Sequence, residues 1–344
     1  MIDEEFAVKL LSWYKINKRQ LPWRDTKDPY IIWISEIILQ QTKVNQGMPY
    51  FYKFIEEFPN IFELASASEQ KVLKLWQGLG YYSRARNLHF TAKYICTELN
   101  GVFPNNYKSI IKLKGVGEYT AAAISSFSFN EKKAVVDGNV YRLLSRYYGI
   151  SDPIDTSYGK KTFSELAFDI LPKNKVNIYN QAIMEFGALQ CTPKKPKCNS
   201  CPLNSKCYSH FHNITDNLPI KSKRIKIKKR AFNYIVITDG ENICLEKRTK
   251  KDIWENLYEF PMIEQEHELF SPNKKTINNA ILIKKKSCNH ILTHQKISAV
   301  FWHFLAKDMS EKNFDNIIKI KSLSNYPVPK IVENYIKENL LIEV

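Results

Sequence analysis

The stretch CTPKKPKCNSCPLNSKC, residues 191–207, carries four cysteines in the spacing C-x6-C-x2-C-x5-C. Structural zinc sites generally use two close pairs of ligands, with about two to four residues between the members of a pair. Only the gap between Cys198 and Cys201 is that short. Four thiolates from one compact loop can instead hold the corners of a [4Fe–4S] cube. The spacing therefore predicts a [4Fe–4S] cluster, with a structural zinc ion as the alternative. The predicted ligands are Cys191, Cys198, Cys201 and Cys207.

The remaining composition is that of an ordinary globular chain with an excess of positive charge. The 344 residues include 51 Lys and Arg against 35 Asp and Glu, a formal net charge of +16. Such a balance suits a polyanionic partner, because each cation that meets a phosphate releases a condensed counterion. Basic charge that serves only solubility is the alternative. Seven cysteines, an acidic start at residues 1–5 and no long apolar run predict a cytoplasmic protein without disulfides or a membrane span.

The pattern of apolar residues divides the chain into two domains. Residues 1–211 show helical spacing, and residues 231–344 show strand-like runs around an Asp239-Gly240 turn signal. Residues 212–230 separate them with seven basic side chains, which form either a solvated linker or one that also touches DNA. The expected strands are 234–237, 243–245, 280–283 and 297–305, and the expected C-terminal helix is 330–340.

The stretch LKGVGEYTA, residues 113–121, combines two glycines with the start of an Ala-rich helix. Glycine lets backbone N–H groups approach a phosphate closely, and a helix N-terminus attracts an anion. A simple tight turn is the alternative. Asp137 follows about 20 residues later, at a position where it could cap a helix, serve as a catalytic carboxylate, or do both.

Together, the cysteine spacing, the glycine hairpin and the Asp resemble the endonuclease III superfamily of DNA glycosylases. The resemblance implies an all-α helix–hairpin–helix domain with a six-helix part, a hairpin at about residues 108–125 and an iron–sulfur loop at 191–207. It implies that Asp137 is catalytic and that the cluster is not the catalytic centre. The hairpin residues implied to bind DNA are Gly115, Val116 and Gly117.

The stretch WISEIILQQT, residues 33–42, resembles the corresponding segment of the MutY family of adenine glycosylases. Glu36 interrupts an apolar run, so partial burial would raise its pKa and let it hold a proton near neutral pH. A Glu on an exposed helix edge is the alternative. Bifunctional relatives carry a hairpin Lys that forms a Schiff base, whereas this chain has Tyr119, which favours a glycosylase that uses water.

Further matches to the same family imply residues for the base pocket and the DNA. The stretch LPWR, residues 21–24, would supply a pocket wall, and residues 78–86 resemble the loop that enters the duplex at the mispair, where a flipped base leaves a gap. The implied adenine-pocket residues are Trp23, Arg24 and Gln181. The implied DNA-binding residues are Gln41, Thr42, Tyr81 and Arg84, with Gln41 and Tyr81 filling the gap.

Residues 231–344 resemble the Nudix-like domain of the same family, notably at WENLYEFP, residues 254–261. A Nudix hydrolase needs an R-E-x-x-E-E helix, and here only Glu264, Glu266 and Glu268 are scattered after the motif, so pyrophosphatase activity is not expected. The family reads 8-oxoguanine through a Phe-Ser-His loop. The matching stretch here is HILTH, residues 290–294, in which Leu replaces Phe and Thr replaces Ser. The resemblance implies that Thr293 and His294, with Gln41 and Tyr81, recognise the lesion.

The sequence therefore predicts an α+β multidomain protein: an all-α helix–hairpin–helix domain plus a C-terminal α/β Nudix-like domain. The predicted activity is removal of adenine from double-stranded DNA where it is mispaired with 8-oxoguanine or G, by a monomer. Glu36 would act as general acid, Asp137 would stabilise the oxocarbenium ion, and Tyr119 would pack near the site. The alternatives are a bifunctional pyrimidine-lesion glycosylase/AP lyase and a non-catalytic mismatch-binding protein.

Overall fold

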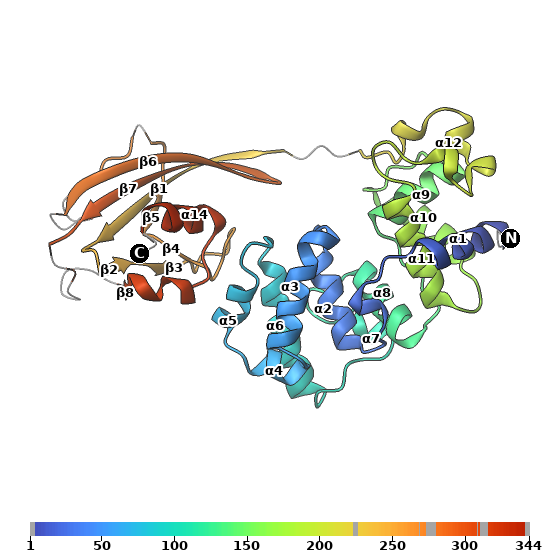
Figure 1. Ribbon diagram of the computed structural model, residues 1–344, viewed down its shortest axis with the longest axis horizontal. Coiled ribbons are helices and arrows are strands. Elements are labelled where there is room, and N and C mark those ends of the chain that lie inside the picture. Colours follow the sequence, from blue (N-terminus) through green and yellow to red (C-terminus); the bar gives the residue numbers. More distant parts are fainter. Residues whose placement is uncertain are drawn as a thin grey trace. The chain divides into compact units, whose positions relative to one another are not determined.

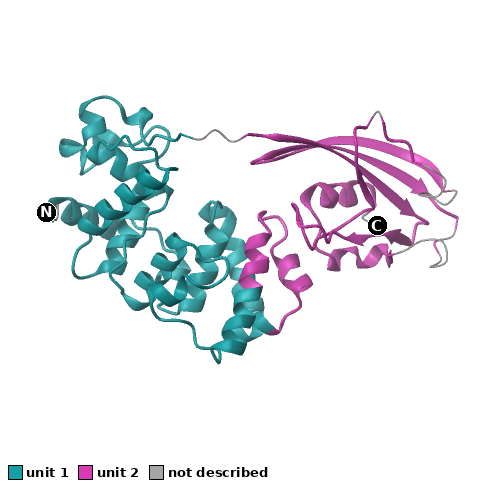
Figure 2. Cartoon of the chain, turned by 180° about the vertical axis from the view of Figure 1, so that it is seen from behind, with its two compact units in different colours: residues 1–65, 90–224 teal, residues 66–89, 225–344 magenta. Residues whose placement is uncertain are grey.

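The structure is a computed structural model of the chain that describes residues 4–222, 226–267, 269–272, 280–307, 309 and 316–340. Lys223 and Arg224 of the basic segment, and Glu268, lie outside the described residues. The chain forms two compact units, one of residues 1–65 with 90–224 and one of residues 66–89 with 225–344 (Figure 2). The second unit therefore contains a piece of the N-terminal half of the chain.

The first unit is helical, as the sequence predicted (Figure 1). Helices α4 and α6 also contribute residues to the second unit. The helices are α1 (Glu4–Asn17), α2 (Pro29–Leu39), α3 (Val44–Glu57), α4 (Ile61–Ser66), α6 (Ser83–Glu98), α7 (Tyr107–Ile110), α8 (Glu118–Phe129), α9 (Gly138–Tyr148), α10 (Ser157–Asp169), α11 (Val176–Leu189) and α12 (Tyr208–Phe211).

Helix starts in this unit follow local sequence signals. Asp28 caps α2 by accepting a hydrogen bond from the Tyr30 backbone N–H at 2.8 Å, and Pro29 occupies the first turn, where no N–H is needed. The turn between α7 and α8 requires a left-handed residue, which Gly115 supplies at φ +80°. A short helix, a glycine turn and a second helix therefore form the predicted helix–hairpin–helix.

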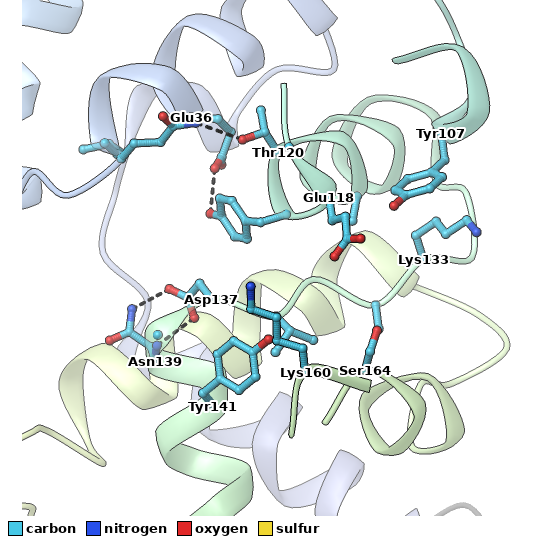
Figure 3. Close-up of a pocket in the computed structure, with 18 of the residues that line it drawn as sticks. Glu36, Tyr107, Glu118, Thr120, Lys133, Asp137, Asn139, Tyr141, Lys160 and Ser164 are labelled. Atoms are coloured by element: carbon cyan, nitrogen blue, oxygen red, sulfur yellow. Dashed lines mark hydrogen bonds between the residues drawn. The ribbon is translucent and has the colours of Figure 1, made fainter. Parts of the chain in front are cut away.

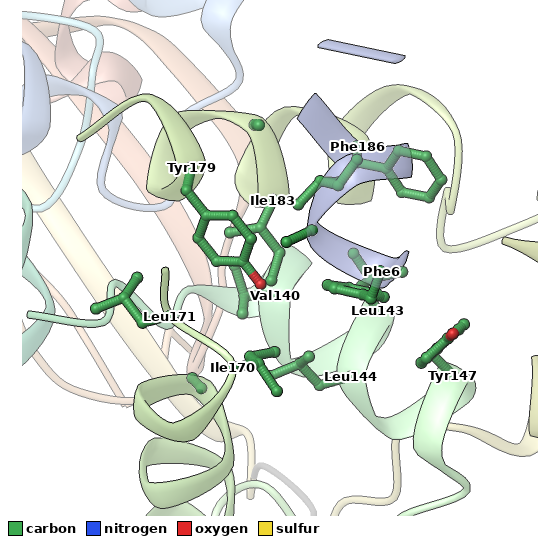
Figure 4. Close-up of a cluster of buried hydrophobic side chains, with 14 of the residues drawn as sticks. Phe6, Val140, Leu143, Leu144, Tyr147, Ile170, Leu171, Tyr179, Ile183 and Phe186 are labelled. Carbon is green, nitrogen blue, oxygen red and sulfur yellow. The ribbon is translucent and has the colours of Figure 1, made fainter. Parts of the chain in front are cut away.

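A core of buried side chains joins α1, α9, α10 and α11 (Figure 4). Helix α9 contributes Val140, Leu143, Leu144 and Tyr147, whose spacing of three and four residues places them on one face. Burying each such side chain contributes about 1.5 to 3 kcal/mol, so this face holds α9 firmly in place. The start of α9, where Asp137 lies, is thereby fixed.

The second unit contains a mixed six-stranded sheet in which β6, β7, β1, β2 and β8 lie in that order and β5 pairs with β1. Strands β1 and β7 are parallel, whereas β6 and β7 form an antiparallel hairpin. The strands of this sheet are β1 (Lys228–Thr238), β2 (Asn242–Cys244), β5 (Met262–Glu264), β6 (Ile281–Leu292), β7 (Gln295–Leu305) and β8 (Ile317–Lys319). A separate two-stranded sheet consists of β3 (Glu246–Lys247) and β4 (Tyr258–Glu259). The unit also contains α5 (Glu69–Leu75) and α14 (Lys330–Asn339), which confirms the predicted C-terminal helix.

Two strands are longer than their sequence patterns indicate. Strand β1 begins at Lys228, inside the interval predicted as linker, and its first residues pair with β7. Strand β6 continues from the predicted run at 280–283 to Leu292, through the three lysines of residues 284–286. It is an edge strand, where lysines are tolerated and discourage pairing with other chains. The lysines therefore hid a strand that the apolar pattern alone did not predict.

Candidate active site

Glu36 and Tyr119 come from different helices and meet in the interior of the helical unit. Glu36 lies on α2 with an exposed fraction of 6%, and Tyr119 lies in the first turn of α8. The Tyr119 hydroxyl donates a hydrogen bond of 2.6 Å to Oε2 of Glu36. The apolar residues around Glu36 in the sequence thus do bury it, and the exposed-edge alternative is wrong.

Burial raises the pKa of Glu36 to about 7. The nearby charge of Asp137 raises the pKa further, while the hydrogen bond from Tyr119 and the charge of Arg24 oppose the shift. Since no cation contacts the carboxyl group among the described residues, desolvation dominates. A carboxyl group in this environment exchanges a proton near neutral pH, as a general acid requires.

Asp137 caps α9, as one reading of the sequence predicted. Its Oδ1 accepts the backbone N–H groups of Asn139 at 2.9 Å and Val140 at 2.8 Å, and its Oδ2 accepts the Asn139 side-chain amide at 2.7 Å. Burial raises the pKa of Asp137, whereas these donors and Arg142 favour the ionised form. The cap holds the carboxylate rigidly, so capping is compatible with a second role in chemistry.

Both carboxylates line one open pocket of about 1330 Å³ (Figure 3). Glu36 reaches it from one side, and Asp137 and Asn139 reach it from the start of α9 opposite. Helix α10 contributes Lys160 and Ser164 to the same pocket, two residues whose place in the site no sequence motif indicates. Other lining residues are Gln41, Thr42, Gly117, Glu118, Tyr119 and Lys133.

A smaller pocket of about 170 Å³ also borders Glu36 and Asp137, and it contains the three residues expected to contact adenine. These residues are Trp23, Arg24 and Gln181. Trp23 is buried and packs edge-on against Phe51, with ring centroids 5.0 Å apart. The Tyr14 hydroxyl donates to Oε1 of Gln181 at 2.9 Å. Helices α2, α8, α9 and α11 thus bring together residues that lie far apart in sequence.

Glu185 is a residue of this small pocket that the sequence analysis missed. Its carboxylate accepts hydrogen bonds from the guanidinium groups of Arg19 and Arg24. The sequence did contain a signal: Glu185 stands four residues after Gln181 on α11, and therefore on the same helix face, among apolar neighbours.

The hairpin and the segment after α2 carry the residues expected to meet DNA within this unit. Gln41 and Thr42 follow α2, and the exposed Gln41 adopts a left-handed backbone at φ +56°. Val116 is buried, with its N–H bonded to the Leu113 carbonyl at 3.1 Å, while Gly117 borders the large pocket. The DNA-binding role of these residues stays a prediction.

The four cysteines of residues 191–207 line a single small pocket under α9 and α11. Each is partly buried, and apolar residues such as Leu143, Phe186 and Leu203 complete the wall. Arg146 approaches from α9, with its Nη1 3.5 Å from Sγ of Cys191. No group of three or more His, Cys, Asp or Glu in the described part of the chain is placed to hold a single metal ion.

Hydrogen bonds connect the cysteine loop to Asp137. Asn139, which donates to Asp137, accepts from Nη2 of Arg142 at 2.8 Å. Nε of Arg142 donates to the Cys191 carbonyl at 2.7 Å, and its Nη2 also donates to the Gly187 carbonyl at 2.6 Å. The buried Arg142 thus ties the cap of α9 to the loop that carries the cysteines.

In the second unit, Tyr81 and the turn between β6 and β7 border one pocket of about 380 Å³. The hydroxyls of Tyr81 and Thr293 share a hydrogen bond of 2.6 Å. Thr293 and His294 form the two-residue turn of the hairpin, and both line the pocket together with Trp254. Residues expected to recognise a lesion, 212 positions apart in sequence, therefore meet within this unit.

Arg84 organises the loop that carries Tyr81. Its guanidinium lies over the ring of Tyr81, 5.7 Å from the centroid, and over that of Trp76, at 5.1 Å. Nη2 donates to the Gly80 carbonyl at 3.1 Å. The side chain expected to contact DNA is thus engaged with its own loop in this structure.

Comparison with known proteins identifies the family. A model of the HhH-GPD superfamily of base excision DNA repair proteins matches residues 34–167, and a NUDIX domain model matches residues 233–338. An adenine DNA glycosylase of Buchnera aphidicola subsp. Baizongia pistaciae is 41% identical over 84% of this chain and 83% of its own length. Another, from Buchnera aphidicola subsp. Acyrthosiphon pisum, is 35% identical over 97% of this chain and 98% of its own.

The chain belongs to the MutY family of adenine DNA glycosylases. Members of this family are base excision repair enzymes that hydrolyse the N-glycosidic bond of adenine. The predicted fold class, a helix–hairpin–helix domain with a Nudix-like domain, is confirmed. The bifunctional pyrimidine-lesion and non-catalytic alternatives are not supported.

Solved structures share the fold of this chain over about three fifths of its length. A thermostable thymine-DNA glycosylase superposes with a TM-score of 0.57 at 32% identity, over 61% of this chain and 96% of its own. An endonuclease III–DNA complex superposes with a TM-score of 0.54 over 62% of this chain and 99% of its own, and at 20% identity it shows the fold alone. No helix among the described residues is long and apolar enough to cross a membrane.

Proposed function

We propose that this MutY-family chain removes adenine from duplex DNA where it lies opposite 8-oxoguanine or G, and does not cleave the strand. The observation that carries the proposal is the buried Glu36, whose pKa is raised to about 7 and whose hydrogen-bond partner is a phenol. A carboxyl group that is half protonated near neutral pH suits a reaction that starts with proton donation.

Glu36 supplies the proton. Adenine is a poor leaving group until it is protonated, and Glu36 delivers the proton to N7 of the base. The hydroxyl of Tyr119 occupies Oε2, so we place the transferable proton on Oε1. After the base has left, the resulting carboxylate of Glu36 can accept a proton from the attacking water.

Asp137 stabilises the sugar. As the C1′–N9 bond breaks, positive charge develops on the sugar ring, and a fixed carboxylate lowers the energy of that state. The hydrogen bonds from Asn139 and Val140 hold Asp137 in place before the reaction, so no reorganisation is required. Water at C1′ then completes the hydrolysis.

Tyr119 limits the enzyme to hydrolysis. Strand cleavage by a bifunctional glycosylase begins with an amine that attacks C1′ and forms an imine. A phenol cannot form an imine, and the hydroxyl of Tyr119 is engaged with Glu36. We therefore expect an intact abasic strand as the product.

The base and its DNA strand have separate binding residues. Trp23, Arg24 and Gln181 line the small pocket beside Glu36 and would enclose the flipped adenine. The hairpin would hold the DNA backbone through the N–H groups of Gly115 and Gly117, because backbone N–H groups beside a helix N-terminus suit a phosphate. Val116, whose N–H bonds the Leu113 carbonyl, would support the turn between them. Gln41 and Thr42 extend the same surface.

The lesion strand would be read in the second unit. Tyr81, Thr293 and His294 line one pocket there, where hydroxyl and imidazole groups can hydrogen-bond the altered edge of 8-oxoguanine. The hydrogen bond between Tyr81 and Thr293 supports a joint role for the loop and the turn. Leu292 stands where the family has Phe, which reduces stacking on the lesion, so hydrogen bonds would carry more of the recognition.

The four cysteines suit a [4Fe–4S] cluster. They surround one pocket from a single loop, in keeping with thiolates at the corners of a cube. Cations of Arg142 and Arg146 beside Cys191 would balance the negative charge of the ligands. When bound, the cluster would cross-link the loop. Cys191 lies on the hydrogen-bonded path to Asp137, so an ordered loop helps to keep Asp137 in position.

Single-turnover cleavage assays on duplexes with A opposite 8-oxoguanine, G or T test the proposal. We expect adenine release from the first two, the fastest opposite 8-oxoguanine, with little borohydride trapping of a covalent DNA adduct. No release of adenine from any duplex would overturn the proposal. The monomeric state and the cytoplasmic location stay predictions from the sequence.

A further inference from the structure

Glu185 occupies an unusual position for a charged group, since it lies inside the helical unit beside the two proposed reaction carboxylates. It sits on α11 with an exposed fraction of 1%, and it lines the same small pocket as Glu36 and Asp137. Glu185 takes no part in the proposed proton transfer or in stabilising the sugar. A buried carboxylate of this kind destabilises the fold unless it is paired, so its partners indicate its purpose.

Two arginines from the segment between α1 and α2 bind Glu185 together. Arg19 uses Nε at 2.8 Å to Oε1 and Nη2 at 2.6 Å to Oε2, the two-pronged geometry that holds a guanidinium most rigidly. The backbone N–H of Arg19 also donates to Oε1 at 2.9 Å. Arg24 donates from Nη2 to Oε2 at 2.7 Å.

The two arginines are also tied to each other, because Nη1 of Arg24 donates to the backbone carbonyl of Arg19 at 3.1 Å. These contacts use two of the five N–H groups of the Arg24 guanidinium. The clamp therefore fixes the orientation of Arg24 in the pocket wall while other donors of its guanidinium are left to meet a base.

We propose that Glu185 is a positioning residue for adenine excision: it clamps Arg19 and Arg24 so that the wall of the base pocket is formed before adenine enters. The proposal rests on the proposed function, because it assumes that adenine occupies this pocket. Glu185 does not touch the reacting atoms. It acts through the arginines, of which Arg24 has a side-chain exposed fraction of only 13%.

Electrostatics within the pocket agree with a permanent clamp. Burial alone would raise the pKa of Glu185, but hydrogen bonds from Arg19 and Arg24 outweigh it and lower the pKa to about 2. The clamp therefore stays charged at every pH at which the enzyme works. One anion against two cations leaves a net positive charge beside Glu36, whose pKa Arg24 lowers.

The test is single-turnover adenine release by the full-length protein with its cofactor. Glu185→Gln keeps the shape of the side chain but removes the charge, and displaced guanidinium groups should lower the rate constant about 100-fold. Glu185→Asp keeps the charge on a shorter side chain, and its rate constant should be about tenfold higher than that of Glu185→Gln. The burst amplitude gives the fraction of active enzyme, so loss of folded protein is separated from loss of rate.

The matched control is Glu5→Gln. Glu5 also binds two cations, Lys9 and Lys206, but it does so at the surface and away from the pocket. We expect its rate constant to remain within twofold of wild type, a change of about 0.4 kcal/mol. Affinity for a duplex with an uncleavable adenine analogue should change little in Glu185→Gln, because Glu185 lines the small pocket and is not one of the residues proposed to hold the DNA backbone.

A double-variant cycle asks whether Glu185 acts through Arg24. In an Arg24→Met background, the fold-decrease in the rate constant caused by Glu185→Gln should be at least ten times smaller than in the wild-type background, because the side chain that Glu185 positions is absent. An equal loss in both backgrounds would overturn the proposal, as would a wild-type rate constant in both Glu185→Gln and Glu185→Asp. A wild-type enzyme that releases no adenine would overturn the proposed function and the clamp together, whereas an active wild type with an unaffected Glu185→Gln overturns the clamp alone.

Discussion

Two regions of the protein bury carboxylates, and they treat the charge in opposite ways. In the helical unit, the partner of Glu36 is the hydroxyl of Tyr119, and burial raises the pKa of Glu36 to about 7. In the second unit, the partly buried Asp252 contacts Arg230 at 2.7 Å and Arg248 at 2.8 Å, and these cations lower its pKa. A carboxylate paired with cations keeps its charge, whereas a buried acid whose partner is a phenol can hold and donate a proton near neutral pH.

In the second unit, a cluster of ion pairs keeps its carboxylates charged. Arg230 binds Asp252 at 2.7 Å and Glu264 at 2.6 Å, and its guanidinium lies over the ring of Phe232. Despite burial, hydrogen bonds from Arg230 and Arg248 lower the pKa of Asp252 well below its usual range. This cluster lies in the Nudix-like domain. Its charged groups form ion pairs that connect β1, β5 and the segment after β3.

The largest expected effect comes from removing the acid of the helical unit. Glu36→Gln cannot donate a proton, so the single-turnover rate of adenine release should fall about 10³-fold or more. Affinity for the mispaired duplex should be retained, as measured by fluorescence anisotropy. Glu98→Gln, an exposed carboxyl at the end of α6, is the control and should keep the wild-type rate. Full activity in Glu36→Gln would show that Glu36 is not the proton donor.

Breaking the paired cluster should cost stability rather than chemistry. Arg248→Met leaves the buried Glu259 without its cation and should lower local stability by about 3 to 5 kcal/mol. Amide hydrogen exchange of peptides from β1 and β7 in the full chain measures this. The control is Lys330→Met, which removes an ion pair between the exposed Lys330 and Glu333 in the same unit. It should change stability by less than about 1 kcal/mol. Unchanged exchange in Arg248→Met would show that the cluster is not structural.

The raised pKa of Glu36 also predicts a stability change with a definite sign. Between the unfolded pKa of 4.5 and the folded pKa of about 7 the native state binds more protons, so stability falls as pH rises through this window. Glu36→Gln has no such titration. Its free energy of unfolding should therefore exceed that of wild type by an amount that grows from near pH 4.5 to a plateau of up to about 3 kcal/mol above pH 7. Thermal unfolding at pH 4.5 and 8 measures the difference. An advantage that does not depend on pH would refute the assignment.

The smallest expected effect concerns lesion recognition in the second unit. Tyr81→Phe removes the hydroxyl that contacts Thr293, a hydrogen bond worth about 1 kcal/mol. The ratio of rate constants for A opposite 8-oxoguanine and A opposite G should therefore fall about fivefold. Tyr94→Phe, a partly exposed tyrosine on α6, is the control. If Tyr81→Phe has the same ratio as Tyr94→Phe and wild type, the Tyr81 loop and the Thr293 turn do not recognise the lesion together.

Much of the helical unit could be predicted from local sequence. Asp28 and Asp137 are helix caps by residue type, and the glycine turn at Gly115 follows from the need for positive φ. The segment around Glu36 is apolar enough to bury a carboxylate wherever its helix packs. In the second unit the Asp239-Gly240 hairpin was predicted and is confirmed by the pairing of Thr238 with Ile243.

Other features could not be read locally. Lys284, Lys285 and Lys286 hid the continuation of β6, since only its place at the sheet edge makes lysines acceptable there. Arg142 looks like an ordinary helix cation in the sequence, yet it is buried and bonded to the Cys191 carbonyl. Residues 66–89 looked like part of the helical domain, and only the contacts of the fold group them with residues 225–344.

The sequence by itself determined the candidates for the reacting groups: an acid in an apolar helix, a carboxylate at a helix start, and a phenol where an amine would form an imine. Residue type and spacing suffice for these because caps, turns and helix faces depend on near neighbours. Only the tertiary structure decided which charges are paired. Glu185 meets Arg19 across 166 positions, whereas Glu36 meets a phenol, and that difference in partners separates a fixed clamp from a proton donor.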